Sequence, residues 1–411
     1  MHICYICREF PPSKRGGGIS TYLNEMASGL VARGHKVTII CASDDTQSET
    51  TVQKGLLTII RLSGGDFVIP QIEGNSILKK ARIFYRFYSY RRKIKYALSQ
   101  IPNIDIIELA EYGAEGYYIM DMNIPIITRL HCPLLMDFKT TGIINLNLST
   151  LKYYWQGKKE LECIHKSKYL SSPSNVMAQW GSRFGQVPLN KIKVIANPIS
   201  NKPITSIDTI SSTFHNDNIT KKKEYNILFV GTICEFKGCG ELCEAIQMLN
   251  NEGFIISLTM IGKQGTYAKQ LKQKYSNANW LNIQNFKPHN EILQLYSAAD
   301  VVCLPSWWES FSLVCTEAMQ EGAIVIGSKS GGMNEIITDG VDGFLVQPHS
   351  TYQLCETIKK VLSLSIKERH KIAFAAQTKI MKTYNINVVI DKMINYYKEC
   401  INDYKEKHSK P

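Results

Sequence analysis

The sequence of 411 residues lacks several features that would assign it to other classes of protein. No stretch approaches the ~20 consecutive apolar residues that a membrane-spanning helix needs. The opening residues, MHICYICREFPP, have neither a basic leader nor a long apolar core, so we expect a first strand there rather than a secretory signal. We also find no internal repeats, so a repeat architecture is not expected.

The cysteines lack a pairwise framework, although there are twelve of them. Cys4 and Cys7 form a C-x-x-C, but it lies within an expected strand and no second pair completes a zinc site. We therefore expect structural thiols in a reducing cytoplasm.

Acidic residues are scarce in the first half of the chain. Residues 1–200 carry 25 Lys and Arg against 15 Asp and Glu, whereas residues 201–411 carry 23 against 21. The net charge of +12 therefore belongs mainly to the first half. Nucleic acid, an anionic membrane surface or an acidic substrate would each explain this basic character.

The most basic stretch runs from Leu78 to Tyr96 and contains no acidic residue. One interpretation is an amphipathic helix with a solvated charged face; the other is a surface that rests on anionic lipid. The aromatic residues beside the charges favour the membrane, and no nucleic-acid-binding motif accompanies the stretch. The basic residues are Lys79, Lys80, Arg82, Arg86, Arg91, Arg92, Lys93 and Lys95, and the aromatic residues expected to enter the headgroups are Phe84, Tyr85, Phe87, Tyr88 and Tyr90.

Short apolar runs alternate with helical patterns along the whole chain, which predicts an α/β fold with parallel sheets. In the first half we expect strands at His2–Cys7, Lys36–Cys41, Leu57–Leu62, Ile104–Glu108, Ile126–Leu130, Lys168–Ser172 and Ile192–Ala196. In the second half we expect them at Asn226–Gly231, Ile255–Ile261, Trp280–Ile283, Asp300–Leu304 and Ala323–Gly327.

A glycine triplet, Gly16, Gly17 and Gly18, separates the first strand from a helix expected at Ile19–Arg33. Backbone N–H groups at such a helix N-terminus suit a phosphate. A glycine triplet is also common in loops without a ligand, and this one is not a Gly-x-Gly-x-x-Gly motif.

The stretch from Pro305 to Val346 contains two carboxylates, Glu309 and Glu317, eight positions apart. Glu309 follows a buried strand, where ligands of open α/β sheets bind. A helix should begin near Phe311, capped by Ser310 or Ser312, which places Glu317 about two turns along it.

This stretch resembles the retaining GT-B glycosyltransferases of family 4. The shared pattern is a proline-ended strand, Glu-x7-Glu, a Gly-Gly-x-x-Glu turn formed here by Gly331, Gly332 and Glu335, and the strand Phe344–Val346. The resemblance covers nearly the whole chain. It implies two Rossmann-like domains facing across a cleft, with a C-terminal helix that crosses back to the N-terminal domain. The implied boundaries are 1–199 for the acceptor-side domain, 200–224 for a linker, 225–384 for the nucleotide-sugar domain and 385–411 for the returning helix and tail.

The resemblance also assigns roles to particular residues. It implies catalytic roles for His131, Lys237 and Glu309, with Glu309 on the sugar hydroxyls and Lys237 on the donor diphosphate. Thr232 stands where the family pattern has an arginine that also contacts the diphosphate, which is a departure. The other residues implied in donor binding are Gly16, Gly17, Gly18, Phe311, Ser312, Leu313 and Glu317, the last on the ribose hydroxyls. Glu108 and Glu111 are further candidates that would face the acceptor.

We therefore expect a retaining, hexosyltransferase-type enzyme that moves a sugar from a nucleotide-diphosphate donor to a glycan or lipid-linked acceptor in bacterial surface polysaccharide synthesis. We expect it in the cytoplasm, peripheral on the inner membrane face, with no nucleic-acid partner. No Asp-x-Asp lies at a strand end, so we expect no metal and no cofactor. The alternative is a catalytically silent nucleotide-sugar-binding subunit of a glycosyltransferase complex, because Thr232 replaces the arginine.

Overall fold

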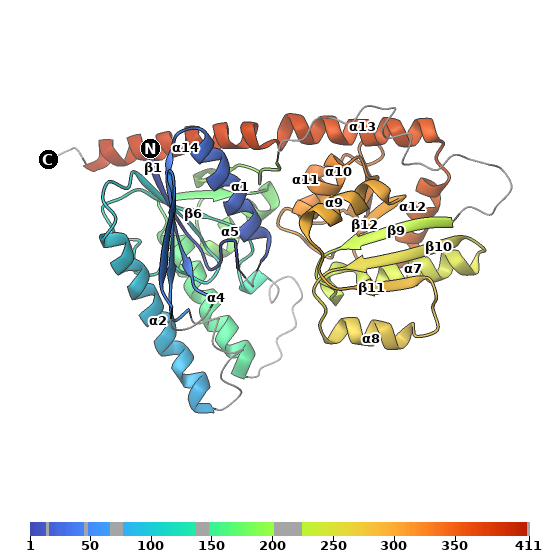
Figure 1. Ribbon diagram of the computed structural model, residues 1–411, viewed down its shortest axis with the longest axis horizontal. Coiled ribbons are helices and arrows are strands. Elements are labelled where there is room, and N and C mark those ends of the chain that lie inside the picture. Colours follow the sequence, from blue (N-terminus) through green and yellow to red (C-terminus); the bar gives the residue numbers. More distant parts are fainter. Residues whose placement is uncertain (14–15, 45–47, 66–76, 137–147, 201–223, 409–411) are drawn as a thin grey trace. The chain divides into compact units, whose positions relative to one another are not determined.

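The computed structural model describes residues 1–411 apart from 14–15, 45–47, 66–76, 137–147, 201–223 and 409–411. The chain forms two compact units (Figure 1). The first contains Met1–Pro198 together with Ile386–Pro411, and the second contains Ile199–Asn385. Nearly all of the linker expected at 200–224 lies outside the described residues.

The first unit is built on an eight-stranded sheet in the order β3-β4-β2-β1-β5-β6-β7-β8. All neighbouring strands pair in parallel except β3, which is antiparallel to β4. The strands are β1 (His2–Ile6), β2 (Lys36–Ala42), β3 (Thr50–Lys54), β4 (Leu57–Leu62), β5 (Ile106–Ala110), β6 (Ile126–Arg129), β7 (Tyr169–Ser172) and β8 (Ile192–Val194).

Helices cover both faces of this sheet because alternate side chains of a strand point to opposite faces. Ile3 and Tyr5 of β1 pack on one side with the helices α1 (Gly18–Ala32) and α14 (Ile386–His408). Cys4 and Ile6 pack on the other side with α2 (Ile77–Ser99). Two further helices of the unit are α4 (Leu148–Lys166) and α5 (Asn175–Gly185). Residues Val389 to Cys400 of α14 thus contribute to the core of the first unit.

The second unit has a six-stranded parallel sheet in the order β11-β10-β9-β12-β13-β14. The strands are β9 (Glu224–Val230), β10 (Ile255–Ile261), β11 (Leu281–Gln284), β12 (Val301–Leu304), β13 (Val325–Ser328) and β14 (Phe344–Val346). The helices are α7 (Cys239–Asn251), α8 (Thr266–Lys274), α9 (His289–Ala298), α10 (Leu313–Gln320), α11 (Met333–Ile336), α12 (Thr351–Leu362) and α13 (Ile366–Thr383).

The two Rossmann-like sheets confirm the predicted fold class, but the structure differs from the expectations in local details. Strand β3 was not predicted, because all of its residues are exposed and it lacks an apolar pattern. Helix α10 begins at Leu313 rather than near Phe311. Helix α14 continues to His408 and so occupies most of the segment expected at 385–411 for the returning helix and tail. No helix among the described residues is both long and apolar enough to span a bilayer.

Candidate functional site

The strand order of the second unit places a topological switch point between β9 and β12. After β9 the chain adds β10 and β11 on one side, then returns to place β12 on the other side of β9. In such sheets the crevice outside the carboxyl ends of the two central strands is the usual ligand site. The loops that follow β9 and β12 carry Lys237 and Glu309 respectively.

Lys237 and Glu309 are brought together at this switch point. The Lys237 Nζ forms an ion pair with Glu309 Oε1, although the two residues are 72 positions apart. The Ser306 hydroxyl donates a second hydrogen bond to Glu309 Oε1 at 2.9 Å. Both side chains remain partly exposed, Lys237 at 31% and Glu309 at 18%. A cation and a carboxylate are therefore held next to each other within reach of a ligand.

The Gly-Gly turn supports the Glu309 loop through direct backbone packing. Gly332 N–H donates to the Glu309 carbonyl at 2.8 Å. A Cβ on Gly331 would lie 2.1 Å from that carbonyl oxygen, and one on Gly332 would lie 2.7 Å from the Ser310 carbonyl oxygen. Gly331 also has φ 68°, a conformation that favours glycine. The motif found in the sequence thus fixes the backbone that carries Glu309.

The start of α10 positions the remaining candidates of this unit. Ser312 is the N-cap, with φ 91°, and its hydroxyl accepts a hydrogen bond from Cys315 N–H. Phe311 is buried and Leu313 is partly exposed. Glu317, one turn along α10, accepts a hydrogen bond of 3.4 Å from the Tyr296 hydroxyl. Glu317 thus lies on the helix that follows the Glu309 loop and contacts α9 through Tyr296.

Thr232 and Trp307 also lie in the loops that follow β9 and β12. Thr232 is exposed and opens the turn that ends at Lys237. Trp307, which the sequence reasoning did not single out, joins this turn to the Glu309 loop. Its backbone N–H donates to the Phe236 carbonyl at 2.8 Å, and its indole Nε1–H donates to Glu241 Oε1 at 2.7 Å. Its place two residues before Glu309 was the signal that could have identified it.

The first unit has a corresponding switch point between β1 and β5, since β2 and β4 lie on one side of β1 and β5 on the other. Gly16, Gly17 and Gly18 follow β1, and all three are exposed. Gly17 is the N-cap of α1. The glycines therefore present the amide end of α1 at the carboxyl edge of the sheet, as predicted from the sequence. Lys14 and Arg15 lie outside the described residues.

His131 follows β6 and is almost fully buried beside Tyr22 of α1. The two rings pack edge to face, with their centroids 5.2 Å apart. Burial, together with the nearby charge of Arg129, holds the pKa of His131 well below its usual value. The Arg129 guanidinium lies over the Tyr22 ring at 4.2 Å. The imidazole is therefore neutral at physiological pH.

The expectation that Glu108 and Glu111 face an acceptor was wrong, because both are fully buried. Glu111 accepts hydrogen bonds from the backbone N–H groups of His131 and Cys132, at 2.8 Å and 2.6 Å. Glu108 accepts from the hydroxyls of Tyr22 at 2.7 Å and Tyr397 at 2.6 Å. Glu111 thus fixes the backbone of His131, and Glu108 ties α1 to α14.

Three residues of α2 that were expected to meet a membrane are not exposed in the structure. Phe87, Tyr90 and Arg91 are buried, and the Arg91 guanidinium donates to the Ala114 carbonyl at 2.9 Å and to the Phe87 carbonyl at 2.8 Å. Tyr90 packs with strands of the sheet, whereas Phe87 packs with Ala114 and with Cys163 of α4, and Arg91 bonds to the loop that contains Ala114. These three residues are therefore unable to meet a lipid surface.

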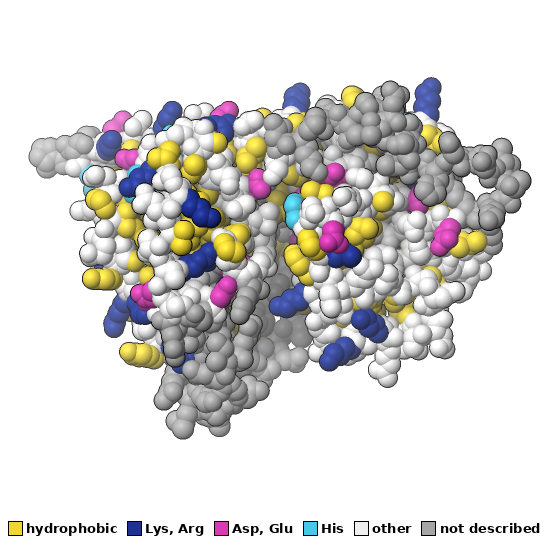
Figure 2. Space-filling view, in the orientation of Figure 1, with side chains coloured by type: hydrophobic (Ala, Val, Ile, Leu, Met, Phe, Trp, Pro, Cys, Tyr) yellow, Lys and Arg dark blue, Asp and Glu magenta, His cyan; other side chains and the backbone are white. Residues whose placement is uncertain are grey.

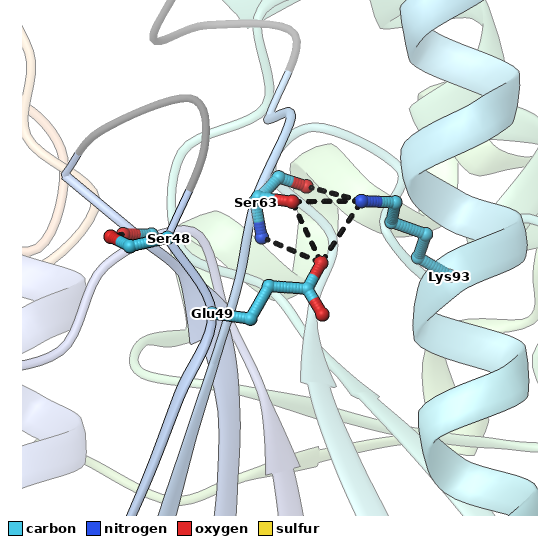
Figure 3. Close-up of polar contacts among 5 residues, drawn as sticks. Ser48, Glu49, Ser63 and Lys93 are labelled. Atoms are coloured by element: carbon cyan, nitrogen blue, oxygen red, sulfur yellow. Dashed lines mark hydrogen bonds and ion pairs between the residues drawn. The ribbon is translucent and has the colours of Figure 1, made fainter.

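Lys93 is exposed, but its charge is paired with the carboxylate of Glu49 (Figure 3). Its Nζ contacts Glu49 Oε1 at 2.9 Å and the Ser63 hydroxyl at 2.8 Å. The exposed residues of α2 include Phe84, Tyr85, Arg92, Lys95 and Tyr96. Lys79, Lys80 and Arg82 belong to the part of α2 whose side chains are not described. Figure 2 shows Lys and Arg side chains among hydrophobic ones on the visible face of the first unit.

Comparison with family models identifies the class of protein. The model of "Glycosyltransferase Family 4" matches residues 16–202, and the model of "Glycosyl transferases group 1" matches residues 211–379. Together the two matches cover most of the chain, and the first ends and the second begins within the linker expected at 200–224. The chain belongs to the group 1 glycosyltransferases with the GT-B fold.

Individual relatives agree with this assignment. An uncharacterized glycosyltransferase of Methanocaldococcus jannaschii is 24% identical over 97% of this chain and 98% of its own length. Sucrose-phosphate synthase from Thermosynechococcus elongatus has a TM-score of 0.78 at 17% identity, covering 98% of this chain and 99% of the other. HepE of Anabaena, solved in complex with UDP-glucose, has a TM-score of 0.66 at 17% identity, covering 97% of this chain and 100% of the other. At these identities the solved structures establish the fold.

Proposed function

We propose that this glycosyltransferase transfers a hexose from a nucleoside diphosphate to a glycan or lipid-linked acceptor, with retention of anomeric configuration. The observation that carries the proposal is the Lys237–Glu309 pair at the switch point of the second unit. A similarly folded protein, HepE, was solved with UDP-glucose, which supports a nucleotide-sugar donor.

The chemical task is to break the bond between the anomeric carbon and the phosphate while a diphosphate leaves with growing negative charge. Fixed cations and N–H dipoles aimed at that charge lower the barrier. Lys237 and the amides at the start of α10 supply them in the second unit, and the amides of Gly16, Gly17 and Gly18 supply them in the first. Glu309 holds the sugar hydroxyls, and Glu317 accepts both ribose hydroxyls.

We take the reaction to be independent of metal and of any cofactor. The proposal rests on the sequence, in which no Asp-x-Asp lies at a strand end, and on Lys237 being available instead. The cations named above suit the diphosphate directly. Retention fits front-face attack within a short-lived ion pair, and we assign the neutral His131 the catalytic role that the resemblance implies.

The acceptor proposal depends on the basic character of residues 1–200, which carry 25 Lys and Arg against 15 Asp and Glu. A lipid-linked glycan at the inner face of a bacterial membrane, as in surface polysaccharide synthesis, matches that charge. Exposed Phe84, Tyr85, Arg92, Lys95 and Tyr96 on α2 provide an aromatic and cationic surface for peripheral contact with anionic lipid. The protein then acts from the cytoplasm.

One feature favours a second function, that of a catalytically silent nucleotide-sugar-binding subunit. Thr232 places no cation where the family pattern has an arginine. Such a subunit would bind the donor without releasing nucleoside diphosphate, so turnover separates the two functions.

A thermal-shift screen of nucleotide sugars tests the proposal, because a ligand that binds only the folded state raises the melting temperature. We expect one nucleotide sugar to raise it, and its free nucleoside diphosphate to do so as well. The stabilising donor is then incubated with membrane lipid extract, and release of nucleoside diphosphate is measured. No shift with any nucleotide sugar would contradict donor binding, and a shift without turnover would favour the silent subunit.

A further inference from the structure

We propose that Lys263 supplies the second cation for the donor diphosphate and takes the place left by Thr232. This inference rests on the proposed nucleoside-diphosphate donor and names a further residue of its site. Lys263 follows β10, in the loop directly beside the one that carries Thr232.

The need for a second cation arises from the charge balance at the switch point. Lys237 is paired with Glu309, so the charge of one is matched by the other. A leaving diphosphate brings at least two negative charges, and Thr232 contributes none. A cation on a neighbouring strand end would therefore supply positive charge that neither the Lys237–Glu309 pair nor Thr232 provides.

The backbone register places Lys263 next to Thr232. β9 and β10 pair in parallel with Val230 opposite Ile261, and the pairing continues to a bridge between Ile233 and Gln264. The partners are 31 positions apart in the sequence both in the strand pair and in the bridge. The same offset places Thr232 opposite Lys263. Two hydrogen bonds of 2.9 Å, from Gly231 N–H to the Ile261 carbonyl and from Ile233 N–H to the Lys263 carbonyl, hold this register.

Because of this register, the side chains of Thr232 and Lys263 project in the same direction. Residues opposite each other in a parallel pair point to the same face, and neighbouring strands lie about 4.8 Å apart. The glycines that precede them both turn the chain with positive φ, 151° at Gly231 and 153° at Gly262, so the relation is preserved past the strand ends. A Cβ on Gly262 would lie 1.9 Å from the Gly231 carbonyl oxygen, which shows how closely the two segments approach.

Lys263 is also available to bind an anion. It is exposed, and its ammonium forms no ion pair or hydrogen bond with another side chain in the described part of the chain. The strand order puts β10, β9 and β12 side by side. Lys263, Lys237 and Glu309 therefore follow one another along a single carboxyl edge, with Lys263 on the far side of the β9 loop from Glu309.

The test compares Lys263→Ala with Lys269→Ala, a matched loss of one exposed lysine on α8. Isothermal titration with UDP, ADP, GDP and TDP first identifies the nucleotide that wild type binds. A hydrogen bond to a charged group contributes ~1.5–3 kcal/mol, so we expect Lys263→Ala to bind that nucleotide at least about tenfold more weakly. Lys269→Ala should bind it as wild type does. Adding Thr232→Arg to Lys263→Ala should restore most of the affinity, because an arginine would then occupy the neighbouring position.

The outcomes separate this inference from the proposed function. If wild type binds none of the four nucleotides, the donor proposal fails and this inference fails with it. If wild type binds one, and Lys263→Ala binds it as well as Lys269→Ala does, the donor proposal stands and Lys263 is only a solvated lysine. Unchanged melting temperatures of the ligand-free variants exclude unfolding as the cause of a lost affinity.

Discussion

The two glutamates of the second unit differ in their surroundings, and that difference separates their expected roles. Glu309 is held by Lys237 and Ser306 on a loop, whereas Glu317 contacts Tyr296 from a helix. Their spacing could be recognised in the sequence because both belong to one short segment. The ion pair could not, because it joins residues 72 positions apart that meet only through the order of β9 and β12.

We expect Glu309→Gln chiefly to reduce kcat, because we propose that Glu309 contacts the sugar that moves during the reaction. Glu317→Gln should weaken binding of free nucleoside diphosphate as well, because the ribose remains with the leaving group. Titration of each variant with nucleoside diphosphate, together with steady-state kinetics, measures both effects. Equal nucleotide affinity of wild type and Glu317→Gln would refute the ribose assignment.

A second prediction at the residue scale concerns Glu160, a buried carboxylate of α4. It accepts hydrogen bonds from Gly113 N–H at 2.6 Å and Leu134 N–H at 2.7 Å, and burial raises its pKa to about 8. The folded state therefore holds a proton that the unfolded state releases above its ordinary pKa of 4.5. The protonated Glu160 therefore stabilises the folded state. This stabilisation is complete below about pH 4.5 and is lost as the pH rises towards 8.

We expect Glu160→Gln to make the free energy of unfolding depend less steeply on pH between 5 and 8 than in wild type. Urea unfolding at several pH values measures the two slopes. Glu162→Gln is the matched control, since that carboxylate lies on the same helix and is 44% exposed. Equal slopes for wild type and Glu160→Gln would show that Glu160 is ionised in the folded state throughout this range.

At the scale of elements, the pattern of apolar runs predicted most strands but not which face of α2 is buried. β9, β10, β12 and β13 were recognisable because buried parallel strands are nearly continuously apolar. The composition of α2 showed that it is basic and aromatic. Only contacts with the loop that contains Ala114 determine that Arg91 points inward while Arg92 points outward, so the lipid-facing residues could not be chosen from the sequence.

Co-sedimentation with lipid vesicles tests whether the exposed side chains of α2 bind an anionic membrane. Replacing Arg92 and Lys95 with Glu should weaken co-sedimentation with acidic vesicles, since each basic side chain near such a surface contributes about 1 kcal/mol. High salt should release wild type from the vesicles. Arg91→Glu should instead unfold the first unit, because it would place an acid among the carbonyl groups that Arg91 contacts. Equal vesicle binding by wild type and the Arg92/Lys95 variant would leave α2 as a solvated face.

At the scale of the whole molecule, the chain begins and ends in the same unit. The Tyr397 hydroxyl of α14 bonds to Tyr5 at 2.8 Å and to Glu108 at 2.6 Å, which links the last helix to the first strand. Helices α1 and α14 touch at Gly29, where an added Cβ would lie 1.8 Å from Ile390 Cδ1. The resemblance predicted the returning helix, but the sequence alone did not show that Gly29 makes room for it.

Gly29→Val should therefore push α14 away from α1 and destabilise the first unit by about 1–3 kcal/mol, the usual cost of overpacking. Ser28→Val is the matched control, because Ser28 is the exposed neighbour on the same helix. Urea unfolding of both variants measures the difference. If the two variants are equally stable, α14 is not packed tightly at this point.

The central claim is that protein cations, led by Lys237, neutralise the leaving diphosphate at the edge of the second sheet. The most direct measurement is release of nucleoside diphosphate under exhaustive chelation by wild type, Lys237→Ala and the surface control Lys272→Ala. We predict full activity for wild type and the control. For Lys237→Ala we predict a loss of roughly 30- to 1,000-fold, equivalent to ~2–4 kcal/mol of transition-state stabilisation. Near-normal turnover by Lys237→Ala, or a strict requirement of wild type for added manganese or magnesium, would contradict the account.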